Sequence, residues 1–292
     1  MCIRDSNIGA GGLIGAVQTT NGAPLTIENC VVNADITGEG NSLAGGLIGF
    51  VSKSNVVTIE KCIAMGTVSN EKGQGAGGLV GGPGRGVTIK NSAALQEEVS
   101  TKGSKYYVDR IFGYDYENVF VNGEQNFAYQ DMRVKCDGNL LDKDNDKKIE
   151  WPELHRGERV SKTDLLTADF WKNTIGWESD TENWKFDNNQ LPTLKMKRSN
   201  DEVEIFSGTD IPDYLQATNS LKGSVKSGGT GIEGVEITFK KESSEKKATT
   251  EPDGTFSIDL ADGTYTVTIK KTGYFTVEKK VTISDADPGA LD

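Results

Sequence analysis

The stretch Gly45-Gly46-Leu47-Ile48-Gly49 decides the fold of this chain, because it is one of three copies of a single unit. Gly-Gly-Leu-Ile-Gly also stands at 11–15 and Gly-Gly-Leu-Val-Gly at 77–81, so the copies begin 34 and 32 residues apart. Self-similarity at this period is typical of stacked coils, none of which buries its apolar side alone. The repeat therefore predicts a solenoid.

A second unit follows each copy of the first. It reads Leu-Thr-Ile-Glu-Asn-Cys at 25–30, Val-Thr-Ile-Glu-Lys-Cys at 57–62 and Val-Thr-Ile-Lys-Asn-Ser at 87–92. Its alternation of apolar and polar residues favours a half-buried strand, and the glycine pair allows a tight corner with close backbone approach. We expect a mainly β chain in which residues 7–100 form a parallel β-solenoid.

The composition excludes two classes of partner. The net charge is −11 and the pI is near 4.8, so the basic footprint that a nucleic-acid backbone requires is missing. No stretch approaches the roughly 18 apolar residues of a membrane helix. Acidic surfaces suit solubility and divalent cations.

The two ends of the chain indicate a fragment. Residues 1–6 resemble a translated sequencing adapter of the kind found in metagenomic contigs, and they lack the pattern of a signal peptide. We leave them out of the fold prediction and expect residues 285–292 to be a truncated tail. The first coil would then be left exposed.

The cysteines allow two interpretations. Cys30 and Cys62 occupy the same place in successive repeats, where stacking would separate their Cα atoms by about 4.8 Å. That separation permits a disulfide without demanding one, and a ladder of free, buried cysteines is the favoured alternative. Cys136 is interpreted as another core or loop thiol.

Residues 101–198 are predicted to be a cap of mixed structure. Its aromatic run, Tyr106–Tyr129, is more typical of core that seals the solenoid than of a platform for sugars. Residues 167–174 are the best helix, with Thr167 as N-cap. The tryptophans at 171, 177 and 184 are expected to pack beneath it.

Residues 199–217 are polar and predict a linker before a second module. Residues 218–284 alternate short strands with turns at Asp253-Gly254 and Asp262-Gly263, which predicts a small antiparallel β-sandwich.

An acidic stretch at 142–153 has the ligand spacing of a calcium loop, with carboxylates at positions 1, 3, 5, 9 and 12. Its one departure is Lys147 at position 6, where such loops carry glycine. An acidic, solvated loop is the alternative. The expected Ca²⁺ ligands, with Lys148 acting through its carbonyl, are Asp142, Asp144, Asp146, Lys148, Glu150 and Glu153.

Catalysis has little support in the sequence. The single histidine, His155, stands among residues typical of an exposed turn, and the cysteines lack zinc-ligand spacing. We expect no catalytic residue in this chain.

Two resemblances complete the prediction. The two repeated units, with Gly-Thr-Val at 66–68, resemble the GLUG repeat of bacterial surface proteins, and the segment up to Leu194 resembles the region that closes such arrays. Ser92 in place of cysteine would mark the final coil. The turns at 253–254 and 262–263, with Lys-Thr-Gly-Tyr at 271–274, resemble the carboxypeptidase regulatory-like family, a prealbumin-type sandwich.

These resemblances imply a non-catalytic, adhesin-like protein that is secreted or held at a bacterial cell surface. Its loop tips at 18–24, 38–42, 52–55 and 70–75 would bind a glycan or a host or cell-surface protein. One alternative is a set of accessory modules of a secreted peptidase or glycoside hydrolase. A purely structural stalk is the other alternative.

Overall fold

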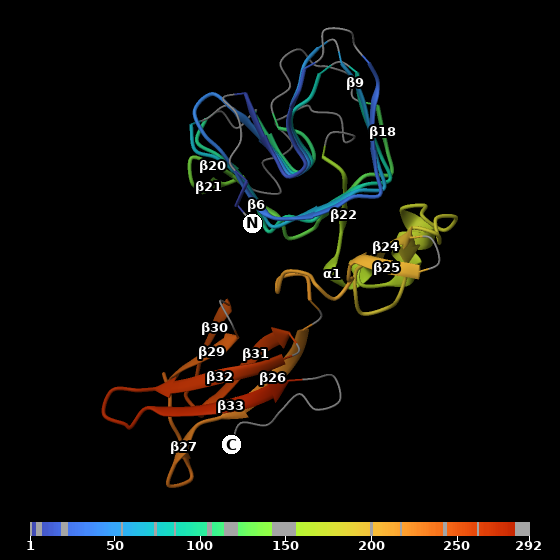
Figure 1. Ribbon diagram of the computed structural model, residues 1–292. Coiled ribbons are helices and arrows are strands. Elements are labelled where there is room, and N and C mark those ends of the chain that lie inside the picture. The colour runs from blue at the N-terminus through green and yellow to red at the C-terminus, as the bar shows by residue number, and fades with distance from the viewer. Residues whose placement is uncertain are drawn as a thin grey trace. The chain divides into compact units, whose positions relative to one another are not determined.

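The computed structural model describes most of the chain in two compact units, residues 1–212 and 213–292 (Figure 1). The described residues are 2–3, 8–18, 23–53, 55–72, 75–84, 86–103, 107–113, 122–141, 156–198, 201–216, 218–241, 244–261 and 263–283.

The first unit contains the predicted parallel β-solenoid. Its first coil holds β2 (Gly9–Gly11), β3 (Ile14–Val17), β4 (Leu25–Glu28), β5 (Val31–Asn33) and β6 (Asp35–Gly38). The second coil holds β7 (Leu43–Gly45), β8 (Ile48–Val51), β9 (Val56–Glu60), β10 (Ile63–Met65) and β11 (Thr67–Asn70). The third coil holds β12 (Gly75–Gly77), β13 (Val80–Gly82), β14 (Gly86–Lys90), β15 (Ala93–Ala94) and β16 (Glu98–Thr101).

The coils continue beyond residue 100, where the sequence placed the start of the cap. A fourth coil holds β17 (Val108–Asp109), β18 (Asn122–Glu124), β19 (Phe127–Tyr129) and β20 (Arg133–Cys136). All four strands pair in parallel with the third coil. The coil of Ser92 is therefore followed by another coil. The sequence did not predict this fourth coil, because its strands lack the glycine-rich unit.

Equivalent residues stack from coil to coil. Ile27 pairs with Ile59 and Ile59 with Ile89, and the latter two are fully buried. Figure 1 views the solenoid nearly along its axis, so the strands of successive coils overlie one another. A shared register places each apolar side chain above its own copy, which builds a continuous core.

The repeated glycines are required by backbone contact. A Cβ at Gly45 would lie 2.0 Å from the Ile48 carbonyl oxygen, and one at Gly46 would lie 2.0 Å from the Gly78 oxygen. Side-chain atoms do not approach this closely, so β7 and β8 pack backbone to backbone.

The solenoid is followed by a short helical segment and a small sheet. The last strand that pairs with the solenoid is β22 (Glu158–Val160), parallel to β19. The elements after it are α1 (Lys162–Leu165), the π-helical turn η4 (Phe170–Thr174), β23 (Trp184–Lys185), β24 (Thr193–Arg198) and β25 (Asp201–Phe206). The predicted helix is thus a π-helical turn beginning at 170, and Thr167 Oγ1 accepts the Phe170 N–H at 3.3 Å. Strand β25 occupies residues where the sequence predicted only linker.

The second unit is built from antiparallel strands, as predicted. Strands β29 (Glu236–Lys241), β30 (Ser244–Thr249), β32 (Gly263–Lys270) and β33 (Val277–Ile283) form one sheet in the order β30-β29-β32-β33. Strands β26 (Thr218–Ser224) and β31 (Thr255–Ala261) form another, and β27 (Lys226–Ser227) with β28 (Thr230–Gly231) forms a hairpin. Phe239, Phe256 and Tyr265 lie in its buried core.

Candidate functional site

The predicted calcium loop lies outside the described residues. This applies to all six expected ligands: Asp142, Asp144, Asp146, Lys148, Glu150 and Glu153. His155 also lies outside them. Within the described ranges, no cluster of three His, Cys, Asp or Glu side chains could hold a metal ion. No helix among the same residues is long and apolar enough to cross a membrane.

The expected binding tips fall into two columns. In one column, residues 70–72 lie beside residues 38–42, because Asn70 pairs with Gly38 and the Glu71 N–H donates to the Gly38 oxygen at 3.3 Å. In the other, the Ser52 N–H donates to the Val17 oxygen at 3.0 Å. Along the chain, strands β7 and β8 connect residues 38–42 of the first column to Ser52 of the second.

A buried amide holds the first column in place. The Asn70 side chain is 1% exposed, and its Nδ2 donates to the carbonyl oxygens of Ser42 and Gly75. Its Oδ1 accepts the Lys72 N–H at 3.0 Å. One side chain therefore ties the tip of the second coil to the tip of the first, which leaves less conformational entropy to lose on binding a partner.

The described tips present polar side chains outward. Glu39, Asn41, Glu71 and Lys72 are exposed in the first column, and Lys53 is exposed in the second. Such groups offer hydrogen-bond donors and acceptors of both charge signs to a polar partner.

A corner residue of unusual conformation recurs in every coil. Asn29, Lys61, Asn91 and Gln125 have φ angles of 52°, 51°, 47° and 52°, in the left-handed region. Asparagine tolerates this region because its short side chain bonds locally. The repeated corner turns each coil from one sheet to the next.

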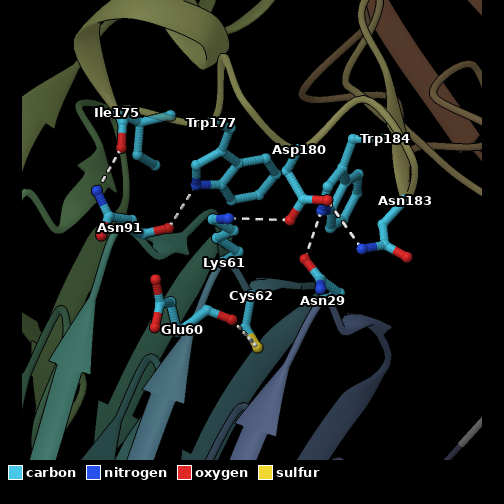
Figure 2. A network of polar contacts seen from close by, with 10 residues as sticks. All are labelled: Asn29, Glu60, Lys61, Cys62, Asn91, Ile175, Trp177, Asp180, Asn183 and Trp184. Carbon is cyan, nitrogen blue, oxygen red and sulfur yellow. Dashed lines mark hydrogen bonds and ion pairs between the residues drawn. The ribbon is translucent and has the colours of Figure 1, made fainter.

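Residues 170–184, which we call the tryptophan clamp, bind three of these corners (Figure 2). Trp184 Nε1 donates to Asn29 Oδ1 at 2.7 Å, and Trp177 Nε1 donates to the Asn91 oxygen at 2.8 Å. Between them, Lys61 Nζ lies 2.9 Å from Asp180 Oδ2. The clamp thus crosses the first three coils and joins them along one corner.

The aromatic side chains of the clamp form core. Trp171, Trp177 and Trp184 are at most 1% exposed, and the centroids of successive rings lie 5.0 and 4.6 Å apart. Phe127 and Tyr129 of the predicted aromatic run are buried as well. These rings have no free face on which a sugar could stack.

The cysteine ladder has a structural explanation. The Cys62 N–H donates to Ser92 Oγ at 3.2 Å, and the Ser92 N–H donates to Asn126 Oδ1 at 3.1 Å. Ser92 and Asn126 therefore each accept an N–H from the coil before, whereas the Cys62 thiol donates to the Glu60 oxygen at 3.2 Å. Cys30, Cys62 and Cys136 are all free thiols, as the favoured interpretation expected.

The two stacked thiols differ in acidity. The Cys62 thiol lies against Cys30, stabilises its thiolate and lowers the pKa of Cys30 to about 7. The same contact, together with burial, raises the pKa of Cys62. The half-buried Cys30 thiol is therefore the more acidic of the two.

The second unit carries a polar groove on the outer face of its four-stranded sheet. The groove has a volume of about 620 Å³. Three lysines and three glutamates line it together with threonines: Lys240, Lys247, Lys270, Glu236, Glu245 and Glu278. The balanced charge gives it no preference for an anion or a cation.

Residues 220–292 match the family model of the carboxypeptidase regulatory-like domain. The second unit carries this domain. The match agrees with the predicted resemblance and with the antiparallel sheets of the unit. No curated protein matches the chain.

The chain is similar to a solved structure described as a "putative immunoglobulin A1 protease" from Bacteroides ovatus. The identity is 25% and the TM-score 0.45, and the similarity covers 64% of this chain and 52% of that one. The chain therefore spans about half the length of that protein. At this TM-score the similarity does not bear on activity.

Sequence reasoning did not find the clamp or its partners. Asp180 and Lys61 are 119 positions apart, and no repeat links them. The left-handed corners could have been predicted from the sequence. An asparagine, which tolerates this conformation, stands immediately before the cysteine or serine of the repeat at Asn29 and Asn91. Asn126 belongs to the same ladder, but it follows a glutamine in a coil without the glycine unit.

Proposed function

We propose that this chain is a non-catalytic, adhesin-like part of a secreted or bacterial cell-surface protein, and that its solenoid is a GLUG-repeat array. The observation that supports this is the first tip column, where a buried asparagine fixes neighbouring polar loops in a common surface. A surface held in its binding conformation costs less entropy when a partner binds.

The chemistry of the tips favours a polar partner. Exposed carboxylate, amide and ammonium groups recur at short spacing along the column, and residues 38–42 and 70–72 include no large apolar residue. A glycan or a polar protein surface offers matching hydroxyl, amide and charged groups. The carboxypeptidase regulatory-like domain would act as a spacer that carries the solenoid.

Alanine blocks test the role of the tips. One variant replaces Glu39, Asn41, Glu71 and Lys72, and a matched control replaces the exposed Glu28 and Lys90 at the ends of β4 and β14. Binding to a glycan array and to cells is measured for both and for the wild type. We expect at least a tenfold loss with the tip variant and no loss with the control. Unchanged binding of the tip variant would refute the placement of the site.

We also propose that residues 142–153 bind Ca²⁺. The support is the ligand spacing in the sequence, with Asp142 and Glu153 at the first and last positions. Calorimetry of the full chain should detect binding that Glu153→Gln abolishes. Lys147→Gly should tighten it, because glycine at position 6 relieves the sharp turn. Absence of heat at millimolar Ca²⁺ would rule the site out.

A further inference from the structure

The polar groove of the second unit lies on the outer face of the sheet formed by β29, β30, β32 and β33. Ile237, Phe239 and Val267 of these strands lie in the buried core, so the residues that alternate with them face outward. An outward face of this kind is ordinarily an evenly solvated polar surface. Here it is hollowed to about 620 Å³, a volume within the usual range of small-molecule pockets, so it has room for a ligand.

Threonine hydroxyls line the centre of the groove, on the two central strands of the sheet. Thr238 of β29 lies directly opposite Thr268 of β32, and Thr266 stands two residues before Thr268. Within the described residues, none of the three hydroxyls has a hydrogen-bond partner in the protein. Each hydroxyl offers one donor and two acceptor lone pairs. The centre can therefore pair with ligand groups that both donate and accept, as the hydroxyls of a sugar do.

The charged side chains around these threonines are only partly paired. Glu236 lies directly opposite Lys270, but its carboxylate lies 3.7 Å from the ammonium group of Lys247 on the other neighbouring strand. In the part of the chain that the structure describes, Lys240, Lys270 and Glu278 form no ion pair. An anion would meet Glu278 and a cation would meet two lysines. The free charges therefore favour a ligand without net charge.

An exposed aromatic loop borders one end of the groove. Residues 271–276 join β32 to β33 (Figure 1), directly after Lys270 and two residues before Glu278, which both line the groove. Within this loop Phe275 is 96% exposed and Tyr274 is 53% exposed. Apolar groups that are exposed beside polar ones are typical of binding surfaces. The loop offers a ring on which the apolar C–H face of a sugar can pack.

We propose that this groove binds a neutral oligosaccharide. The central threonine hydroxyls bond to the sugar hydroxyls, and the free lysines and Glu278 bond to those at the margin. Phe275 packs against the C–H face of one sugar ring. The site belongs to the carboxypeptidase regulatory-like domain, so that domain binds a ligand of its own as well as carrying the solenoid. It is independent of partner binding at the solenoid tips.

Calorimetry of the full chain tests the proposal with five neutral trisaccharides: cellotriose, maltotriose, xylotriose, mannotriose and triacetylchitotriose. We expect at least one to bind with a Kd of about 1 mM or lower. Thr238→Val combined with Thr268→Val keeps the β-branched shape and should weaken this binding at least tenfold. Thr264→Val is the matched control on β32. Thr264 lies outside the groove lining, and its hydroxyl lies 3.0 Å from that of Thr282.

Three further titrations sharpen the result. Phe275→Ala should weaken binding at least threefold, while the alanine block at the solenoid tips should leave it unchanged. Trigalacturonate, an acidic trisaccharide, should bind no more tightly than the best neutral sugar. The proposal is overturned if none of the five sugars binds at about 10 mM, if the double threonine variant binds like the control, or if trigalacturonate binds more tightly.

Discussion

Leu13 and Leu47 occupy the same place in consecutive coils, but one is 43% exposed and the other is fully buried. The thiols of Cys30 and Cys62 differ in the same way, the first half-buried and the second buried. The first and second coils share the Gly-Gly-Leu-Ile-Gly unit and the Thr-Ile-Glu-X-Cys unit in the same register. The comparison teaches that in this fold the neighbouring coil, more than the local sequence, decides how far a side chain is buried, how stable its coil is and how acidic a thiol is.

The largest expected effect concerns the clamp that joins the first coil to its neighbours. Trp184→Ala should destabilise the first unit by about 3–5 kcal/mol, because it empties a fully buried ring site. Trp184→Phe keeps most of the packing and loses the hydrogen bond to Asn29, so about 1 kcal/mol is expected. Urea unfolding followed by tryptophan fluorescence measures both. Equal stability of both variants and the wild type would show that the clamp does not hold the first coil.

The next largest effect on stability is expected at the equivalent leucines of the first two coils. Leu47→Ala should cost about 2–5 kcal/mol through the cavity it leaves, whereas Leu13→Ala should stay within about 0.5 kcal/mol in the monomer. The same urea titration, run at low protein concentration, measures the pair. Equal losses for the two variants would mean that the first coil is as well packed as the second.

A smaller effect is expected at the ion pair between the second coil and the clamp. Lys61 and Asp180 side chains are 20% and 11% exposed, so their contact is only partly screened by water. Lys61→Met should cost about 1–2 kcal/mol, since the Asp180 carboxylate loses a charged donor. Lys90→Met, at an exposed strand end, is the control. A loss no greater than that of the control would assign the pair no role.

The last prediction concerns reactivity with little change in stability. The Cys30 thiolate forms as pH rises through about 7, so its alkylation by iodoacetamide should rise with a midpoint near that pH and level off at higher pH. Cys62, whose pKa is raised, should stay unmodified in the folded chain up to pH 9. Peptide mass spectrometry reports both sites. In Cys62→Ala, which removes the hydrogen-bond donor, the Cys30 midpoint should move upward, and an unmoved midpoint would contradict the assigned cause.

The sequence predicted those parts of the molecule that repeat. Three glycine-rich copies predicted the parallel solenoid, and Ile27, Ile59 and Ile89 predicted its register. The fourth coil was not predicted, because Phe127 and its neighbours do not resemble the earlier copies, although the backbone pairs in the same way.

The tryptophan clamp was not predicted for a different reason. Its contacts join residues such as Trp184 and Asn29, which are 155 positions apart, and depend on a π-helical turn that no period encodes. The tips were predicted from their composition, but the two columns depend on where β7 and β8 lie.

Hydrogen–deuterium exchange of the full chain at low protein concentration tests the central claim most directly. The stacked register predicts strong, similar protection for amides of β9, β10 and β14, whose coils have neighbours on both sides. Amides of β4 and β5 should exchange measurably faster in this chain, because among the described residues each of these strands pairs with a neighbour on one side only. Equal protection of the first and second coils would contradict the claim that the neighbouring coil decides the stability of each repeat.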